Sequence, residues 1–138
     1  MKLLLLDVNV VLDILLDRQP HASSAVALWA EIENGRAKGF LPAHAVTTIH
    51  YLVSRARGTQ AARRAVLTIL SVCKVSVVND EIVRSALALE WRDFEDAVCA
   101  ASAAVQDCDA IVTRDPSGFP DSPVRVMDAG TALAWLRA

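Results

Sequence analysis

The chain has 138 residues, of which 54% are hydrophobic and 22% are charged. A domain of this length can bury one good core, and the composition excludes an intrinsically disordered chain. No apolar run reaches the roughly 18 residues that a membrane helix needs, and Asp7 ends the opening apolar run too early for a secretion signal. We therefore expect one cytoplasmic domain over residues 1–138, without a membrane segment.

Charge is distributed unevenly, although the net charge is only −2. Residues 34–79 contain no Asp or Glu but do contain seven Lys and Arg: Arg36, Lys38, Arg55, Arg57, Arg63, Arg64 and Lys74. This asymmetry suggests a phosphate-facing surface beside an acidic surface that attracts metal. Solvated helix faces would give the same pattern, so the charge distribution does not decide between the two interpretations.

Hydrophobic periodicity predicts strands that alternate with helices along the chain. Asn9 and Thr59 are the expected N-caps of the first and fourth helices. The alternation predicts a three-layer α/β/α sandwich with a central parallel sheet of about five strands. The predicted strands cover residues 3–6, 39–42, 74–78, 109–113 and 124–127, and the predicted helices cover residues 8–16, 22–34, 44–57, 59–72, 80–91, 93–106 and 128–136.

Four aspartates are expected to meet at one edge of this sheet. Asp7 follows the first strand and Asp115 follows the fourth, so both lie where ligands of open parallel sheets bind. Asp93 and Asp96 lie in the first turn of the helix before the fourth strand, with the i, i+3 spacing that gives them one face. Carboxylates gathered in this way repel one another unless a cation is bound, and oxygen ligands favour Mg²⁺ or Mn²⁺.

Each of these acids also has a purely structural interpretation. Asp93 and Asp96 match the positive end of a helix dipole, and Asp115 suits a turn before Pro116. Asp7 is harder to explain in this way, because a carboxylate at the end of an apolar strand is costly unless something pairs with it.

Other polar residues are predicted to have structural roles. Asp13 lies within a helix and Asp109 begins a strand, so we interpret both as structural. Glu95 is expected to point away from Asp96 into solvent. His50 shares a helical face with apolar residues and is interpreted as a core histidine, and no cluster has the spacing of a zinc site.

Three segments resemble the PIN domain family, which includes the VapC-like toxins of toxin–antitoxin pairs. They are Leu4–Asp13, Asp93–Val98 and Cys108–Asp115, and their order and spacing cover essentially the whole chain. The resemblance implies an α/β/α fold, bound Mg²⁺ or Mn²⁺ and endoribonuclease activity.

The resemblance also implies roles for individual residues. It makes Asp7, Asp96 and Asp115 the catalytic, metal-binding carboxylates, with Asn9 and Thr113 orienting them through hydrogen bonds. A homodimer is implied in the same way, and a cognate antitoxin is a further expected partner.

One position departs from the family pattern. The family usually carries a glutamate in the helix after the second strand, and Thr48 occupies that position here, where we expect it beside the carboxylates as an orienting residue. Either Asp93 compensates as a further metal ligand or the site holds metal weakly. The alternative function is therefore a catalytically weak or inactive PIN domain that binds RNA or a protein.

Candidate RNA-binding residues come from the basic segment. We expect Arg55, Arg57, Arg63 and Arg64, together with Arg114, to guide RNA phosphates toward the aspartates. Other nucleotide-handling folds fit less well: the chain lacks glycine-rich phosphate loops, and Asp7-Val8-Asn9 lacks the second carboxylate of phosphoaspartyl-transfer enzymes.

Overall fold

The computed structural model describes all residues, 1–138, and contains one five-stranded sheet. Its strand order is β3-β2-β1-β4-β5, and every neighbouring pair is parallel. The predicted parallel sheet is therefore confirmed. The strands are β1 (Lys2–Leu6), β2 (Ala37–Pro42), β3 (Cys73–Ser76), β4 (Ala110–Val112) and β5 (Val126–Met127).

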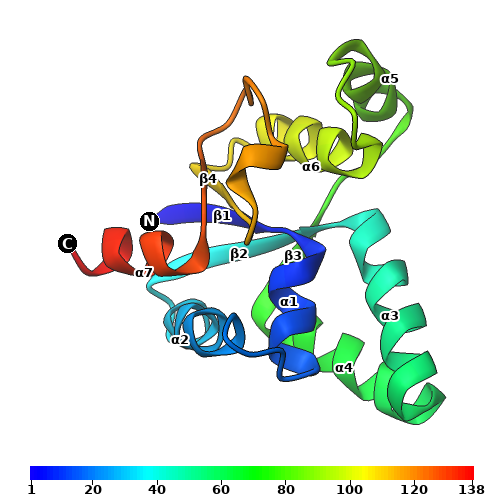
Figure 1. Cartoon of the computed structure of the whole chain (residues 1–138), viewed down its shortest axis with the longest axis vertical. Helices are drawn as coiled ribbons and strands as arrows, with labels where there is room; N and C mark the ends of the chain where they lie inside the picture. The colour runs from blue at the N-terminus through cyan, green and yellow to red at the C-terminus, as the bar shows by residue number, and fades with distance from the viewer.

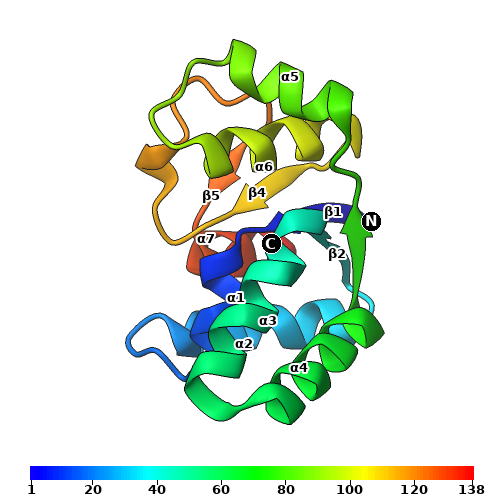
Figure 2. The ribbon, with the colours of Figure 1, turned by 90° about the vertical axis from the view of Figure 1, so that its right-hand side faces the viewer.

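Seven helices cover the two faces of the sheet (Figures 1 and 2). One face packs against α1, α2, α3, α4 and α7, and the other packs against α6, whose outer side is covered by α5. The predicted three-layer sandwich is thus confirmed. The helices are α1 (Val8–Leu15), α2 (Ala22–Glu33), α3 (Ala43–Arg57), α4 (Thr59–Val72), α5 (Asp80–Ala88), α6 (Phe94–Val105) and α7 (Ala129–Arg137), with a 3₁₀ turn η1 (Pro116–Gly118).

Alternation along β1 divides the core between the two faces. Leu4 and Leu6 join the larger apolar cluster with α1 to α4, whereas Leu5 points to the other side and packs with Cys99 and Ile111. Successive side chains of a strand point to opposite faces, so a strand buried on both sides reads as a continuous apolar run. No helix combines the length and the apolar character needed to cross a bilayer.

Several element ends differ from the prediction. The first helix is capped by Asp7 in place of Asn9, because the Asp7 carboxylate accepts a hydrogen bond from the backbone N–H of Val8 at 2.8 Å. Thr59 is the first residue of α4, and Gly58 precedes it with φ of 91°. The predicted helix 80–91 ends at Ala88.

His50 in α3 is half-buried, so it is more exposed than the core histidine that we predicted. Asp109 has the structural role that we expected. Its carboxylate accepts a hydrogen bond from the Leu3 N–H at 2.7 Å, and its own N–H donates to the Leu3 carbonyl. These bonds fix the start of β4 against β1, the pair of strands that carries the candidate site.

Gly39 in β2 provides a test of this packing. A Cβ added there would lie 2.8 Å from Sγ of the buried Cys73 and 3.2 Å from Ile32. We expect Gly39→Ala to lower the free energy of unfolding by about 1–3 kcal/mol, the usual cost of overpacking a core. Urea unfolding measures this value.

The Cys73→Ala background is the control, since it removes the sulfur atom that Gly39→Ala would meet. In that background Gly39→Ala should cost less than in the wild type. An equal cost in both backgrounds would show that the close approach of Cys73 does not explain the requirement for glycine.

Candidate functional site

The candidate site lies where the strand order reverses, between β1 and β4. These two strands are neighbours in the centre of the sheet, with Leu6 paired to Val112. Asp7 follows β1, and the segment from Thr113 to Asp115 follows β4. Open parallel sheets bind ligands at such a switch point, outside the carboxyl ends of the strands.

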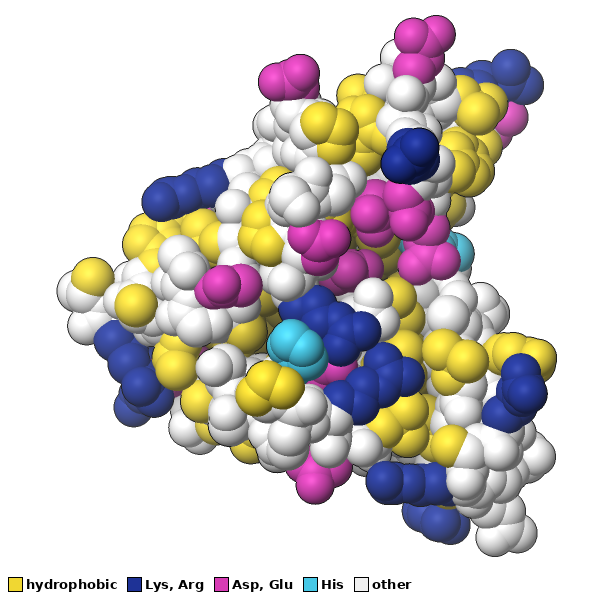
Figure 3. Space-filling view, viewed as in Figure 1, with side chains coloured by type: hydrophobic (Ala, Val, Ile, Leu, Met, Phe, Trp, Pro, Cys, Tyr) yellow, Lys and Arg dark blue, Asp and Glu magenta, His cyan; other side chains and the backbone are white.

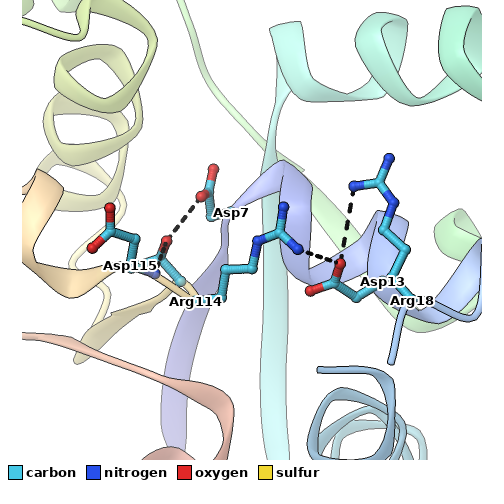
Figure 4. Close-up of polar contacts among 6 residues, drawn as sticks. Asp7, Asp13, Arg18, Arg114 and Asp115 are labelled. Carbon is cyan, nitrogen blue, oxygen red and sulfur yellow. Dashed lines mark hydrogen bonds and ion pairs between the residues drawn. The ribbon is translucent and has the colours of Figure 1, made fainter. Parts of the chain in front are cut away.

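Asp7 is the buried anchor of the site, with 4% of its surface exposed. Its Oδ1 accepts from the Val8 N–H at 2.8 Å, and its Oδ2 accepts from the Thr113 hydroxyl at 2.9 Å (Figure 4). Burial raises the pKa of Asp7, although both hydrogen bonds oppose this rise. The carboxylate is therefore held in place but remains poorly solvated.

Thr113 connects Asp7 to Asp115. Its side chain is buried, and its Oγ1 both donates to Asp7 and accepts from the Asp115 N–H at 3.3 Å. The carboxylate of Asp115 in turn accepts from the Ser117 hydroxyl at 2.6 Å. Thr113 thus has the contact to Asp7 that we expected, whereas Ser117 was not identified from the sequence because nothing in its local pattern separates it from a turn serine.

Asp96 faces the same region from α6. Asp93 is the N-cap of this helix, and its Oδ1 accepts from the Asp96 N–H at 3.1 Å. Burial, and then the charges of Asp7, Asp93, Glu95 and Asp115, raise the pKa of Asp96 to about 7. The four aspartates predicted to meet therefore do influence one another, and Asp93 also has the structural role of a cap.

Glu95 belongs to the same group of charges. Its side chain is exposed, as expected, and its charge nevertheless contributes to the raised pKa of both Asp7 and Asp96. Burial and the charge of Asp93 raise the pKa of Glu95 itself. We call these five residues the acidic cluster: Asp7, Asp93, Glu95, Asp96 and Asp115.

Gly118 lies against two members of the acidic cluster. A Cβ at this position would lie 3.2 Å from Oδ2 of Asp96 and 3.8 Å from Oδ2 of Asp115. The two carboxylates therefore border the same small space, which any side chain at position 118 would enter.

Two expected orienting residues do not contact the acidic cluster. Asn9 is half-buried in the first turn of α1, and its side chain makes no hydrogen bond within the protein. Thr48 donates its hydroxyl to the carbonyl of His44, one turn earlier in α3. Neither side chain orients a carboxylate in this structure.

His44 lies close to the acidic cluster. Its position in the first turn of a helix did not predict this from the sequence. Its Nδ1 is buried without a hydrogen-bond partner, and its Nε2 lies 3.9 Å from Sγ of Cys99. Burial lowers the pKa of His44, whereas the charge of Asp7 opposes that change. The packing of α3 against α1 and β2 brings this side chain to the site.

Arg114 is paired with a buried carboxylate, although its own side chain is 34% exposed. Its Nη1 lies 3.1 Å from Oδ1 of Asp13, and Nη1 of Arg18 lies 4.0 Å from the same oxygen (Figure 4). Asp13 is thus structural, as expected. Arg18 joins it although no sequence pattern singled it out.

The remaining candidate arginines lie away from the acidic cluster. Arg55 and Arg57 are in the last turn of α3, about 20 Å along the helix axis from its start near the site, and Arg63 and Arg64 are exposed on the following helix. On the face shown in Figure 3, acidic side chains gather in one patch and Lys and Arg side chains lie directly beside it.

The acidic cluster fits a hard divalent cation in its chemistry. All its donors are carboxylate oxygens, and the pKa of Asp96 is raised by burial and then by the repulsion that a cation would remove. No three His, Cys, Asp or Glu side chains approach closely enough to form a closed ligand set. The cluster therefore offers a negative field and oxygen donors rather than a finished coordination shell.

The fold and the site together define a class of protein: an α/β/α sandwich that gathers acidic side chains at the switch point of its parallel sheet. The sequence matches the PIN domain family over residues 3–117, so the chain belongs to that family. None of the curated proteins matches it at a significant level.

Solved structures of low sequence identity share the fold. VapBC2 from Rickettsia felis, bound to promoter DNA, has a TM-score of 0.71 at 12% identity and covers 91% of this chain and 98% of its own. VapBC-1 from nontypeable Haemophilus influenzae also has a TM-score of 0.71 at 12% identity, covering 92% and 98%. VapC20 from Mycobacterium tuberculosis, a Sarcin-Ricin loop cleaving toxin, has a TM-score of 0.65 at 19% identity, covering 78% and 86%.

The raised pKa values predict how stability depends on pH in the absence of metal. Asp7, Glu95 and Asp96 bind protons more tightly in the folded chain than in the unfolded one, so the free energy of unfolding falls as pH rises from the ordinary carboxyl range near 4 to about 7. We expect Tm to be a few degrees higher at pH 5.5 than at pH 8 in thermal unfolding with chelator present.

Asp96→Asn is the matched variant, because it removes the charge but keeps the shape. It should raise Tm at pH 8 and reduce the difference between the two pH values. A wild-type Tm that rises between pH 5.5 and pH 8, or a variant that retains the full difference, would contradict the assignment of repulsion to this cluster.

Proposed function

We propose that the chain is a divalent-metal-dependent endoribonuclease that hydrolyses RNA phosphodiester bonds, and the toxin of a toxin–antitoxin pair. The observation that carries the proposal is the acidic cluster at the switch point, where four other acids help to raise the pKa of Asp96 to about 7. A fold has no structural need to hold five carboxylates together, and stored repulsion of this kind marks functional sites.

The roles follow from the contacts. Asp7, Asp96 and Asp115 would hold Mg²⁺ or Mn²⁺, with Asp93 nearby. Thr113 fixes the orientation of Asp7, and Ser117 fixes that of Asp115. A bound divalent cation would supply the positive charge that makes a water nucleophilic and that stabilises the leaving oxygen.

RNA is the substrate class that the family and the charges support. VapC20, which shares the fold, is a toxin that cleaves the Sarcin-Ricin loop. Arg114 and Arg18 stand beside the acidic cluster, and a polyanion needs such cations to approach five carboxylates. We propose that RNA phosphates also contact four arginines further from the acidic cluster, on α3 and α4: Arg55, Arg57, Arg63 and Arg64.

Partners and location are part of the same proposal. Two structures of the same fold are complexes, VapBC2 and VapBC-1, and we propose that this chain also binds a cognate antitoxin, in the cytoplasm. Leu67 and Leu70 of α4 and Val26 of α2 are about half exposed, and we propose that they contribute to a homodimer interface.

The alternative is a PIN domain that binds RNA or a protein without cutting. Thr48 supports it, because its hydroxyl is directed to its own helix and supplies no carboxylate to the site. The absence of a closed ligand set agrees with weak metal binding. A measurement of RNA cleavage distinguishes the nuclease from the binding domain directly.

We expect cleavage of a structured RNA panel in Mn²⁺ or Mg²⁺ to fall at least about 100-fold in Asp7→Asn and in Asp96→Asn, the scale on which loss of a catalytic electrostatic group acts. Gel analysis of 5′-labelled RNA measures both the rate and the cleavage position.

Asp107→Asn is the matched control, since Asp107 is exposed just beyond the opposite end of α6 from Asp96. It should cleave at the wild-type rate. Cleavage that persists in both site variants would rule out the acidic cluster as the active site, and no cleavage by a folded, metal-saturated wild type would favour the binding module.

The distant arginines predict a second measurable effect. Changing Arg63 and Arg64 together to Ala should weaken RNA binding and reduce the slope of log affinity against log salt by roughly 0.7 for each single-strand phosphate that the protein no longer neutralises. Filter binding at several salt concentrations measures the slope.

Arg84→Ala on α5 is the control, because Arg84 is equally exposed but belongs to the opposite layer of the sandwich. It should leave the slope unchanged. An unchanged affinity and slope in the Arg63 and Arg64 variant would show that RNA does not reach α4.

A further inference from the structure

A cavity of about 300 Å³ opens between α1, α2 and the start of α7. Its polar lining consists of residues outside the acidic cluster: Asp13, His21, Ser24, Arg114 and Asp128. The volume lies at the lower end of the range for small-molecule sites. The cavity is therefore suited to one ring-sized group and excludes a duplex or a helix.

The cavity and the acidic cluster share one short loop. Arg114, which lines the cavity, stands between Thr113 and Asp115, and Thr113 holds Asp7. Figure 4 shows the side chain of Arg114 reaching from Asp115 toward Asp13. A strand of RNA lying on the acidic cluster would therefore have the mouth of this cavity beside it.

Asp13 gives the cavity its specific chemistry. Its side chain is 2% exposed, and both Arg114 and Arg18 approach Oδ1 only. Oδ2 accepts no hydrogen bond within the protein, whereas Oδ1 accepts from Nη1 of Arg114 at 3.1 Å (Figure 4). A carboxylate oxygen of a buried side chain is costly without a donor, so a ligand N–H placed there would be stabilised.

The charges around the cavity disfavour a phosphate. Arg114 is already paired with Asp13, and Asp128 adds a second carboxylate whose Oδ1 accepts from the Thr131 N–H. A neutral, planar group with N–H donors suits this lining better than an anion. The exocyclic amino groups of bases are donors of this kind, and Asp and Glu accept from them in nucleic-acid complexes.

We propose that this cavity binds a nucleobase with an exocyclic amino group, as in adenine, cytosine or guanine, with Oδ2 of Asp13 as the acceptor. This inference rests on the proposed function, because the base belongs to the RNA strand whose phosphate lies at the acidic cluster. Uracil has no exocyclic amino group, and its one free ring N–H lies between two carbonyl oxygens that the carboxylate of Asp13 would repel, so uracil is disfavoured. The cavity thereby contributes to the choice of cleavage position.

Ser24 and Ser23 form a matched pair of positions for the test. Ser24 lines the cavity opposite Gly130, where an added Cβ would lie 3.9 Å from the Ser24 hydroxyl. Ser24→Leu therefore fills the space. Ser23 precedes it on α2, is exposed and does not line the cavity, so Ser23→Leu makes the same change outside it.

The experiment is titration of the whole protein, with chelator present, by AMP, CMP, GMP, UMP and inorganic phosphate, followed by NMR. We expect at least one amino-bearing nucleotide to bind at least tenfold more tightly than UMP and phosphate. Ser24→Leu should weaken that binding at least tenfold, and Ser23→Leu should not change it. Asp13→Asn, which keeps the shape, should remove the preference over UMP.

Equal binding of all four nucleotides and phosphate would overturn the proposal, as would no binding by the folded protein or unchanged binding in Ser24→Leu. Binding of phosphate alone would identify an anion site instead. The titration needs neither metal nor cleavage, so it can succeed when the nuclease proposal fails. Cleavage without nucleotide binding would overturn the base site alone.

Discussion

The buried carboxylate of Asp7 is the constraint on which the rest of the site depends. It ends a strand that is apolar on both faces, caps α1 and accepts the hydroxyl of Thr113 from the neighbouring strand. Those two hydrogen bonds orient the charge without neutralising it. Because β1 and β4 meet at the switch point, any acid that follows β4 or begins α6 is brought close to a carboxylate that has little water around it.

Asp7 and Asp13 are both buried, but only one of the two carboxylates is paired with cations. Asp13 is neutralised by Arg114 and Arg18, so its charge is compensated within the fold. Asp7 has no cationic partner and is surrounded by further acids. The charge of Asp7 is therefore left uncompensated within the fold, as the proposed metal site requires. This contrast in pairing distinguishes Asp13 from Asp7 more clearly than burial does, since both are buried.

The fold followed from local patterns, because apolar runs and helical periodicity are read from neighbouring residues. The approach of Asp7, Asp96 and Asp115 to one edge followed in turn from the topology of the predicted parallel sheet, without any knowledge of individual side-chain contacts. Contacts between distant segments did not follow from local patterns. The pair of Arg114 with Asp13 joins residues that are far apart in the chain, and His44 reaches Cys99 only after α3 is packed. The cap of α1 was misassigned because Asn9 and Asp7 are both good capping residues, and only the backbone conformation distinguishes them. The effect of the Glu95 charge on Asp7 was not expected, because helical spacing describes one helix and not the acids that approach it from other elements.

The central claim is that the acidic cluster binds a divalent cation by exchanging it for a proton. Calorimetric titration with Mn²⁺ in two buffers of different ionisation enthalpy measures the protons released on binding. The account predicts release of a substantial fraction of a proton at pH 6.5, declining toward zero above pH 8, since the pKa of Asp96 is about 7. Asp96→Asn should abolish this release. Mn²⁺ binding at pH 6.5 without proton release, or no binding by the folded protein at pH 8, would contradict the account.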